Sequence, residues 1–113
     1  MKELSMYIRP DKLEKVKNIL VDKFLCGGMT ISNVMGCGNQ KGFTDEYVGV
    51  RSSVNLLPKI KIEVIVKDED VEAIVEDICD ETVTGMSGDG KIIIKEVLDA
   101  VRVRTKERGN HAI

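Results

Sequence analysis

Apolar and polar residues alternate along three short stretches of the chain, and each alternation predicts a β-strand. Residues 3–9 alternate until Pro10, which ends the strand because proline cannot extend a hydrogen-bonded ladder. Residues 29–35 form a second predicted strand and residues 60–66 a third. The apolar run within residues 91–95 predicts a fourth strand, buried on both faces.

Two other stretches place their apolar residues at helical spacing. The first predicted helix opens at Asp11, which can form a capping box with Glu14, and stops at Gly27 and Gly28. Its apolar stripe consists of Leu13, Val16, Ile19, Leu20 and Phe24. The second opens with residues 67–70, whose acidic side chains suit the positive end of a helix. Its stripe consists of Val71, Ile74, Val75, Ile78 and Cys79.

The order of these elements predicts one domain over residues 1–113 with a ferredoxin-like β-α-β-β-α-β fold of the α+β class. In that fold a four-stranded antiparallel sheet carries both helices on one face. The other face is bare, and a homo-oligomer is the simplest cover for its apolar residues. The tail, residues 97–113, is predicted to add a helical turn, a strand over residues 101–104 and a polar end.

A long segment without a regular apolar period separates the second and third strands. It spans residues 37–55, and a loop of this length in a compact domain usually serves as a lid or binding arm. Near its ends lie Gln40, Lys41 and Lys59, polar groups suited to an anionic ligand. We therefore expect function to be concentrated in and around this loop.

Composition narrows the classes of protein. The 113 residues are 42% hydrophobic, enough for a real core, and the 32% of charged residues sum to a net charge of −2, which argues against nucleic-acid binding by bulk electrostatics. The sequence shows neither a signal peptide nor an apolar run long enough to span a membrane, which predicts a cytoplasmic protein. Its three cysteines lie far apart, so neither a disulfide framework nor a zinc site is expected.

A glycine-rich turn over residues 84–91 is the first candidate for chemistry. Its spacing from Gly85 to Lys91 matches a phosphate loop, but Ile92 replaces the hydroxyl that would hold magnesium, and the turn leads from helix to strand rather than the reverse. An ATPase loop is therefore rejected. Backbone N–H groups beside Lys91 remain suited to an anion.

Arg102 and Arg104 are the second candidate. Two residues apart on the predicted final strand, they project from one face, while Val101 and Val103 are expected to enter the core from the other. Two guanidinium groups on one face suit a phosphate, although a solvated charged edge strand explains the pattern equally well.

Taken together, these segments resemble the PII signal-transduction proteins of nitrogen metabolism, and the resemblance extends over essentially the whole chain. The motifs that carry it are Gly36-x-Gly38-x-Gln40-Lys41-Gly42, Tyr47-x-Gly49, Leu57-Pro58-Lys59-x-Lys61-Ile62-Glu63, Thr84-Gly85-x-x-Gly88-Asp89-Gly90-Lys91-Ile92 and Arg102-x-Arg104-Thr105. The resemblance implies a homotrimer with long T-loops between the second and third strands. It also implies a cleft between subunits in which ATP and ADP compete.

The resemblance assigns roles to individual positions. The residues that it places around the nucleotide are Thr30, Gly38, Ile62, Glu63, Val64, Gly88, Asp89, Gly90 and Lys91, with Arg102 and Arg104 from the adjacent subunit. It implies that Gln40 completes a magnesium site with ATP and 2-oxoglutarate, which fits the preference of magnesium for six oxygen ligands. It pairs Lys59 with the distal carboxylate of 2-oxoglutarate and places Lys41 and Gly42 beside the same effector.

The same resemblance implies a regulator without enzymatic activity that acts on a target such as an ammonium transporter, glutamine synthetase, nitrogenase or a biosynthetic kinase. Membrane association would then arise only through a transporter. Ser52 stands where bacterial relatives carry a uridylylated tyrosine, so that modification is excluded, and phosphorylation of Ser52 or Ser53 is left open. Two other ferredoxin-like classes are the alternatives. An RNA-binding sheet needs stacking aromatics, of which the strands offer only Tyr7, and a trimeric metal-tolerance protein needs a metal cluster.

Overall fold

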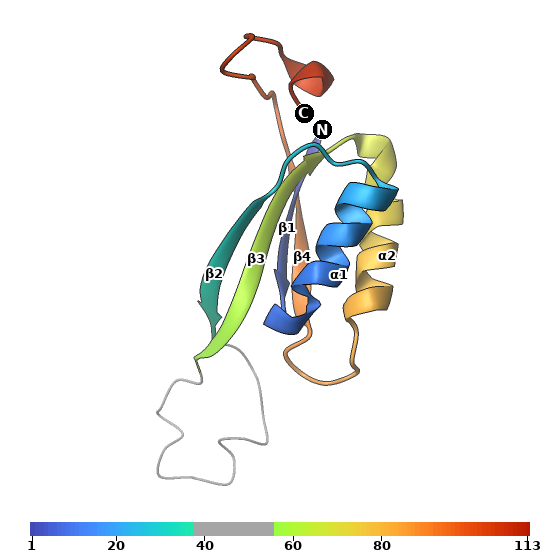
Figure 1. The fold of residues 1–113 in the computed structure, drawn as a ribbon, viewed down its shortest axis with the longest axis vertical. Helices are drawn as coiled ribbons and strands as arrows, with labels where there is room; N and C mark the ends of the chain where they lie inside the picture. Colours follow the sequence, from blue (N-terminus) through green and yellow to red (C-terminus); the bar gives the residue numbers. More distant parts are fainter. Residues whose placement is uncertain (38–55) are drawn as a thin grey trace, which may run out of the picture.

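The computed structural model describes residues 1–37 and 56–113. Four strands form one antiparallel sheet in the order β2-β3-β1-β4. The strands are β1 (Lys2–Ile8), β2 (Thr30–Gly36), β3 (Leu57–Val66) and β4 (Gly90–Glu96). Figure 1 shows the two helical segments on one face of this sheet, as the ferredoxin-like prediction requires, and the fold class is confirmed.

The first helical segment combines three kinds of turn. A 3₁₀ turn, Pro10–Lys12, leads into α1 (Leu13–Asn18), and a π-helical turn, Ile19–Lys23, ends it. The predicted capping box is wrong, because Arg9 is the N-cap, makes no side-chain capping bond, and leaves Asp11 inside the first turn. The predicted stop at Gly27 and Gly28 is also late. Leu25 already has a left-handed backbone (φ 55°), and the Cys26 N–H bonds to the Leu20 carbonyl at 2.9 Å.

The second helix, α2 (Val71–Thr82), follows a 3₁₀ turn, Asp68–Asp70, as the acidic opening predicts. It buries Val71, Ile74, Ile78 and Thr82. The prediction that Cys79 belongs to this stripe is wrong, because that side chain is exposed. Thr82 takes the place one turn after Ile78 and donates its hydroxyl proton to the Ile78 carbonyl at 2.8 Å.

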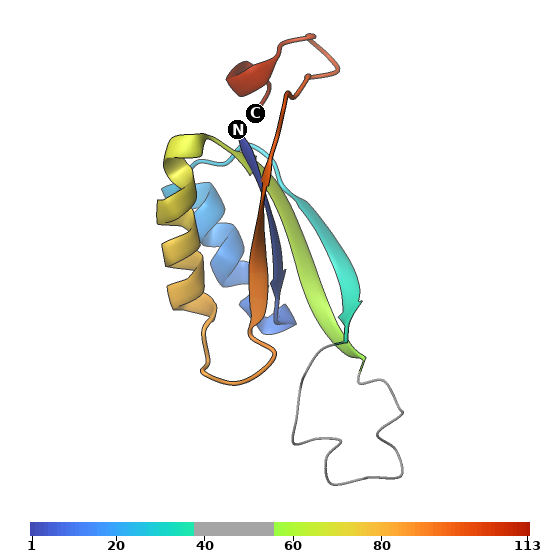
Figure 2. The same ribbon diagram turned by 180° about the vertical axis from the view of Figure 1, so that it is seen from behind.

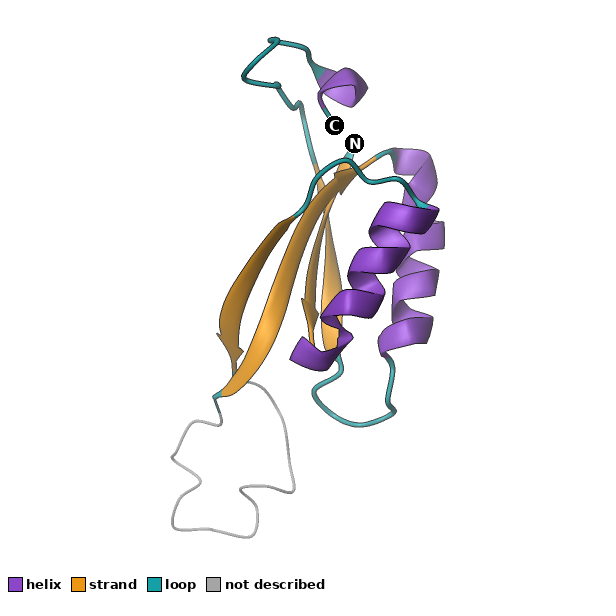
Figure 3. Cartoon of the chain, in the orientation of Figure 1, coloured by secondary structure: helices purple, strands orange, loops and turns teal. Residues whose placement is uncertain are grey.

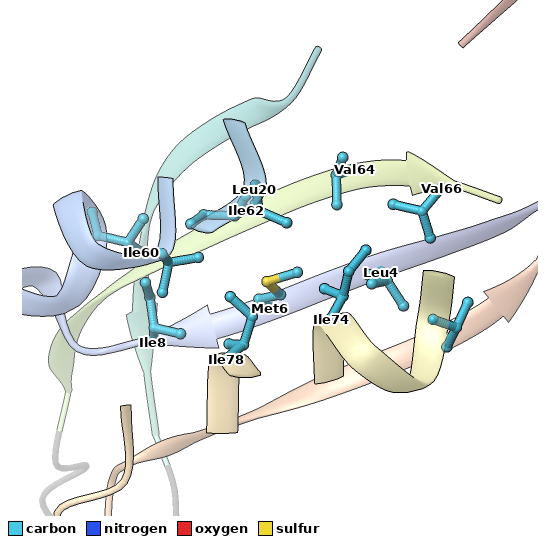
Figure 4. Packing of buried hydrophobic residues seen from close by; sticks show 12 residues of the cluster. Leu4, Met6, Ile8, Leu20, Ile60, Ile62, Val64, Val66, Ile74 and Ile78 are labelled. Atoms are coloured by element: carbon cyan, nitrogen blue, oxygen red, sulfur yellow. The ribbon is translucent and has the colours of Figure 1, made fainter. Parts of the chain in front are cut away.

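The core lies between the helices and the sheet, as Figure 4 shows. Its buried members are Leu4, Met6, Ile8, Val16, Leu20, Ile60, Ile62, Val64, Val66, Val71, Ile74 and Ile78. Even-numbered residues of β1 and β3 face the helices together because their antiparallel register pairs Leu4 with Val64 and Met6 with Ile62. The alternation read from the sequence therefore defines the buried face correctly for both central strands.

Strand β4 corrects the prediction of a strand buried on both faces. It lies at an edge of the sheet, where Ile93 is 37% exposed and Ile94 is 47% exposed. Strand β3 is longer than predicted and includes Pro58, which is tolerated because this part of β3 pairs only with β2. Strand β2 ends at Gly36 and strand β3 begins at Leu57, so the two strands border the segment predicted as a loop, residues 37–55.

The tail does not form the predicted strand over residues 101–104 or the helical turn before it. A single β-bridge joins Val101 to Arg108, and a 3₁₀ turn, Gly109–Ala112, ends the chain. Val101 and Val103, expected in the core, are exposed, Val103 by 93%. Figure 2, seen from behind, shows the tail projecting beyond the sheet on the side of the N-terminus.

Candidate functional site

A pocket of about 570 Å³ lies at the end of the sheet where β2 ends and β3 and β4 begin. Figure 3 shows this end of the sheet beside the loop that joins α2 to β4. The lining residues are Tyr7, Val34, Met35, Gly36, Cys37, Lys59, Ser87, Gly88, Gly90, Lys91 and Ile93. Two lysines, a stretch of glycine-rich backbone and a partly apolar wall therefore share one cavity.

The α2–β4 turn needs glycine where it enters the sheet. Gly90 has a φ of +107° and pairs with Ile8 across β1 and β4. A Cβ at this position would lie 1.7 Å from the Tyr7 carbonyl oxygen, far inside contact distance. Gly88, with a φ of +91°, also adopts a backbone conformation that L-residues rarely reach. The close approach of two strands thus requires glycine at position 90, and the positive φ favours it at position 88.

The carboxylate of Asp89 holds this turn together from within. It accepts hydrogen bonds from the Thr84 N–H at 2.7 Å, the Gly85 N–H at 3.1 Å and the Thr84 hydroxyl. Arg9 donates its Nε proton to Asp89 Oδ1 at 3.2 Å and an Nη2 proton to the Ser87 carbonyl at 2.8 Å. These bonds, those from Thr84 first, hold the pKa of Asp89 well below its ordinary range. Asp89 therefore stays ionised and fully engaged inside the turn.

Lys59 connects the start of β3 to the same turn, because its ammonium group donates a hydrogen bond to the Gly88 carbonyl. Burial lowers the pKa of Lys59, and the positive charge of Arg9 lowers it further, against the opposing effect of Asp89. Lys59 and Arg9 thus both donate hydrogen bonds to this turn, and the charge of Asp89 offsets their mutual repulsion only in part. An anionic ligand would relieve this arrangement.

A small polar network continues from the pocket over the open face of the sheet. The Lys61 ammonium lies 5.6 Å from the centre of the Tyr7 ring and 3.7 Å from Glu63 Oε1. Ser5 is buried and donates its hydroxyl proton to Glu3 at 3.0 Å, and Lys95 lies 3.8 Å from the same carboxylate. Charged side chains on this face are therefore already partly paired within one chain.

The structure brings some of the predicted site residues together. Gly88, Gly90, Lys91 and Lys59 line the pocket. Asp89 lies in the same turn, but its carboxylate is committed to Thr84, Gly85 and Arg9 rather than facing a ligand. The predictions on Gly38, Gln40, Lys41, Gly42 and Ser52 fall outside the described residues.

Other predicted site residues lie elsewhere. Thr30 begins the seven-residue strand β2, whereas Gly36, at the pocket, ends it, so the two residues are about 20 Å apart along the strand. The side chains of Ile62 and Val64 are in the core, so only their backbone could contact a ligand. Glu63 pairs in register with Thr30, at the end of the sheet away from the pocket. Arg102 and Arg104 belong to the tail, which Figure 1 places at the end opposite the α2–β4 turn.

Sequence reasoning missed Tyr7 and Arg9. Tyr7 lines the pocket on the open face, and its alternation with the buried Met6 and Ile8 was the signal that could have placed it there. Arg9 follows β1 directly, and nothing in its local sequence indicates a partner 80 residues away.

Two searches of the described residues bear on the class of site. Among residues 1–37 and 56–113, no group of three or more His, Cys, Asp or Glu side chains is arranged to hold a metal ion. None of the helices in these ranges is long and apolar enough to cross a membrane.

Comparison with known proteins adds a family to this geometry. A family model described as nitrogen regulatory protein P-II matches residues 1–107. Nitrogen regulatory protein P-II 2 of Methanothermobacter thermautotrophicus is 50% identical over 113 residues, which are 100% of this chain and 97% of the relative. The nitrogen regulatory proteins P-II of Pyropia yezoensis and Rhizobium meliloti are 44% and 42% identical, with both chains covered in full.

Proposed function

Since the chain belongs to the nitrogen regulatory protein P-II family, we propose that it binds ATP or ADP together with 2-oxoglutarate and regulates a target protein accordingly. In this proposal the loop between β2 and β3 contacts the target, so ligands bound at its base change what it presents. The protein is a nitrogen-signalling regulator, and we assign it no catalytic step.

The observation that carries the proposal is the composition of the pocket. Lys59 and Lys91 line it beside the glycine-rich backbone of Gly88 and Gly90. Ammonium groups and closely approachable backbone suit phosphate oxygens, and Val34, Tyr7 and Ile93 give the cavity an apolar wall. The lining contains no carboxylate to pair with these two lysines, and the three phosphates of ATP would supply the anionic partner.

The position of the arginines supports a site shared between copies of the chain. Strand β4 alone carries the chain about 20 Å away from Gly90, and Arg102 and Arg104 lie beyond its far end. They cannot complete the pocket of their own chain in this arrangement. A neighbouring copy could supply them, and the open face of the sheet, with Ile93 partly exposed, offers a surface on which copies can associate. We propose a homotrimer on this basis and on the family resemblance.

The effector and the metal follow from the same chemistry. Lys59 lies at the start of β3, where its ammonium could exchange the Gly88 carbonyl for a carboxylate of 2-oxoglutarate. The pocket lining that the structure describes contains no Asp or Glu, and the nearby carboxylate of Asp89 is engaged with Thr84 and Arg9. This lining fits a magnesium ion held mainly by phosphate and effector oxygens, with Gln40 as the expected amide ligand. When bound, magnesium would supply positive charge that offsets the negative charge of these oxygens.

We propose that the bound nucleotide determines which target protein the loop between β2 and β3 contacts. ADP lacks the terminal phosphate, so it would leave the metal and effector less firmly held than ATP and favour a different population of loop conformations. Candidate targets are an ammonium transporter, glutamine synthetase, nitrogenase or a biosynthetic kinase. Localisation would be cytoplasmic, with membrane association only through a transporter.

Calorimetric titration and light scattering test the proposal. We expect a trimer that binds Mg-ATP and ADP competitively. Arg102→Ala and Arg104→Ala should each lower the affinity for ATP about tenfold or more, since a hydrogen bond to a charged group is worth roughly 1.5–3 kcal/mol. The circular dichroism spectrum of each variant should match that of wild type. A stable monomer, or a trimer that ignores millimolar ATP, would overturn the proposal. A pull-down from lysate with and without 2-oxoglutarate would then identify the target.

A further inference from the structure

Residues 99–109 form a small hairpin that we call the tail hairpin. The bridge between Val101 and Arg108 pairs its two arms. Backbone hydrogen bonds run from the Arg102 N–H to the Glu107 carbonyl at 2.9 Å and from the Lys106 N–H to the Arg102 carbonyl at 2.7 Å. The segment that carries the two arginines is therefore a folded unit with its own backbone bonds.

Asp99 joins the beginning of the tail hairpin to its end. Its Oδ1 accepts hydrogen bonds from the Ala100 N–H at 2.8 Å and the Gly109 N–H at 3.2 Å, and its Oδ2 accepts one from Arg108 Nη1 at 2.6 Å. The Gly109 N–H also bonds to the Ala100 carbonyl at 3.0 Å. Arg108 and these N–H groups lower the pKa of Asp99, so its carboxylate is charged at neutral pH. One side chain thus closes the base of the hairpin with three bonds.

Apolar packing contributes little to this segment within one chain. Leu98 is 98% exposed and Val101 and Val103 are also exposed. An isolated two-stranded hairpin is only marginally stable in water, so its polar contacts decide how much of the time it is formed. Among these polar contacts of the tail, the three hydrogen bonds that Asp99 accepts form the largest group around one side chain.

Arg102 lies on the first arm of the tail hairpin and Arg104 lies in its turn. Arg102 Nη1 is 3.4 Å from Glu107 Oε1, on the opposite arm. Arg104 is exposed at the turn and makes no ion pair with the residues that the structure describes. Both guanidinium groups therefore depend on the hairpin for their relative position, and Arg104 is free to meet an anion outside its own chain.

We propose that Asp99 is a positioning residue for this arginine pair. By keeping the tail hairpin formed before ligand binding, it presents Arg102 and Arg104 together to the phosphates of a nucleotide bound to a neighbouring copy. Binding then avoids the entropy cost of ordering the segment. The inference rests on the proposed function, because it takes ATP as the ligand of the arginines.

The test uses the full-length protein with ATP as the probe and compares Asp99→Asn with Asp99→Ala. Asparagine keeps an oxygen for the backbone N–H groups but loses the charge that Arg108 contacts, whereas alanine loses every bond. We expect ATP affinity to fall in the order wild type, Asp99→Asn, Asp99→Ala, by about threefold to tenfold for alanine, as for the ordering of a few side chains. Amide hydrogen exchange at Arg102 and Lys106 should accelerate in the same order, although the partners of these amides are unchanged.

A double-mutant cycle separates positioning from general damage. In a protein that already carries Arg102→Ala and Arg104→Ala, Asp99→Ala should cost no further ATP affinity. Glu96→Gln is the matched control, because Glu96 forms a 2.6 Å ion pair with Lys2 just before the tail hairpin and should leave ATP affinity unchanged.

The outcomes distinguish the two levels of the argument. If wild type binds ATP and Asp99→Ala binds it equally well, the positioning role is wrong and the proposed function stands. An equal loss of affinity with and without the arginines also overturns positioning. If wild-type protein fails to bind millimolar ATP, the proposed function fails and the inference fails with it.

Discussion

Arg9 and Asp89 lie 80 residues apart in the sequence, and their side chains meet at 3.2 Å between Nε and Oδ1. The contact ties the residue that follows β1 to the turn that leads into β4. Arg9 also binds the Ser87 carbonyl, so it fixes the backbone of the turn as well as its carboxylate. A cation at the end of a central strand thus helps to shape the glycine-rich wall of the pocket.

The first prediction concerns Asp89→Asn. Because the folded-state pKa of Asp89 is lowered, its ionised form stabilises the native state fully above about pH 4, the range of an unfolded aspartate, and less as the pH falls toward the folded-state pKa. We expect the variant to be less stable than wild type at pH 7, with the difference shrinking below pH 4. Urea unfolding at several pH values measures this. Asp11→Asn, at an exposed position, is the control and should follow the wild-type curve, whereas a pH-independent difference for Asp89→Asn would contradict the argument.

Gly90→Ala tests the close approach of β4 to β1. The added Cβ would lie 1.7 Å from the Tyr7 carbonyl oxygen at a φ of +107°, so strands must separate or the turn must rearrange. We expect a loss of at least about 2 kcal/mol in the free energy of unfolding. Gly28→Ala is the matched control, because nothing lies within 4 Å of a Cβ there, and it should be close to neutral. Equal stability of the two variants would show that the turn is not constrained in this way.

Leu20 and Leu98 provide a matched pair for the core. Leu20 is fully buried between helix and sheet, whereas Leu98 is 98% exposed. Leu20→Ala should lower the free energy of unfolding by about 2–5 kcal/mol. Leu98→Ala should change the free energy of unfolding of an isolated chain by no more than about 0.5 kcal/mol. A larger loss of stability that depends on protein concentration would show that Leu98 lies in a contact between copies of the chain.

The alternation in the sequence was sufficient for the central strands but not for β4. Leu4 and Ile62 each occupy a position with period two, and both are buried as predicted. An unbroken run such as Ile92 to Ile94 is typical of a strand covered on both faces, yet β4 lies at an edge of the sheet, and its Ile93 and Ile94 are partly exposed. Position in the sheet is a tertiary property, and a local pattern does not contain it.

In the candidate site, too, the sequence predicted the features that depend on neighbouring residues and missed those that depend on residues far apart in the chain. Glycine spacing and Lys91 identify the turn, because a tight helix-to-strand connection is a local property. Arg9 could not be assigned, because its partner Asp89 comes near only when β1 and β4 pair. The predicted final strand failed because Val101 and Val103 have no neighbour in the single chain against which to pack.

The last prediction concerns the coupling of ligands at the base of the β2–β3 loop. A small dianion gains little from one lysine in water, whereas a metal already held by triphosphate offers it further ligand contacts. 2-Oxoglutarate should therefore bind well with Mg-ATP, poorly with Mg-ADP, and poorly with ATP plus a chelator. ATP and the effector should strengthen each other by the same factor. Calorimetric titration of 2-oxoglutarate under the three conditions measures this coupling.

Two variants locate the coupling in the protein. Gln40→Ala should weaken the binding of 2-oxoglutarate by weakening the binding of the metal. The difference in 2-oxoglutarate affinity between the Mg-ATP sample and the chelated sample should therefore become smaller. Lys59→Gln should weaken the effector under all conditions, because it removes the ammonium that binds the Gly88 carbonyl in the structure and would bind a carboxylate in the complex. Lys17→Gln, whose ion pair with Glu14 lies on α1, is the control and should bind normally. If 2-oxoglutarate binds wild type equally well with Mg-ATP, Mg-ADP and chelated ATP, the metal does not bridge effector and nucleotide, and Lys59 would have to recognise the effector without it.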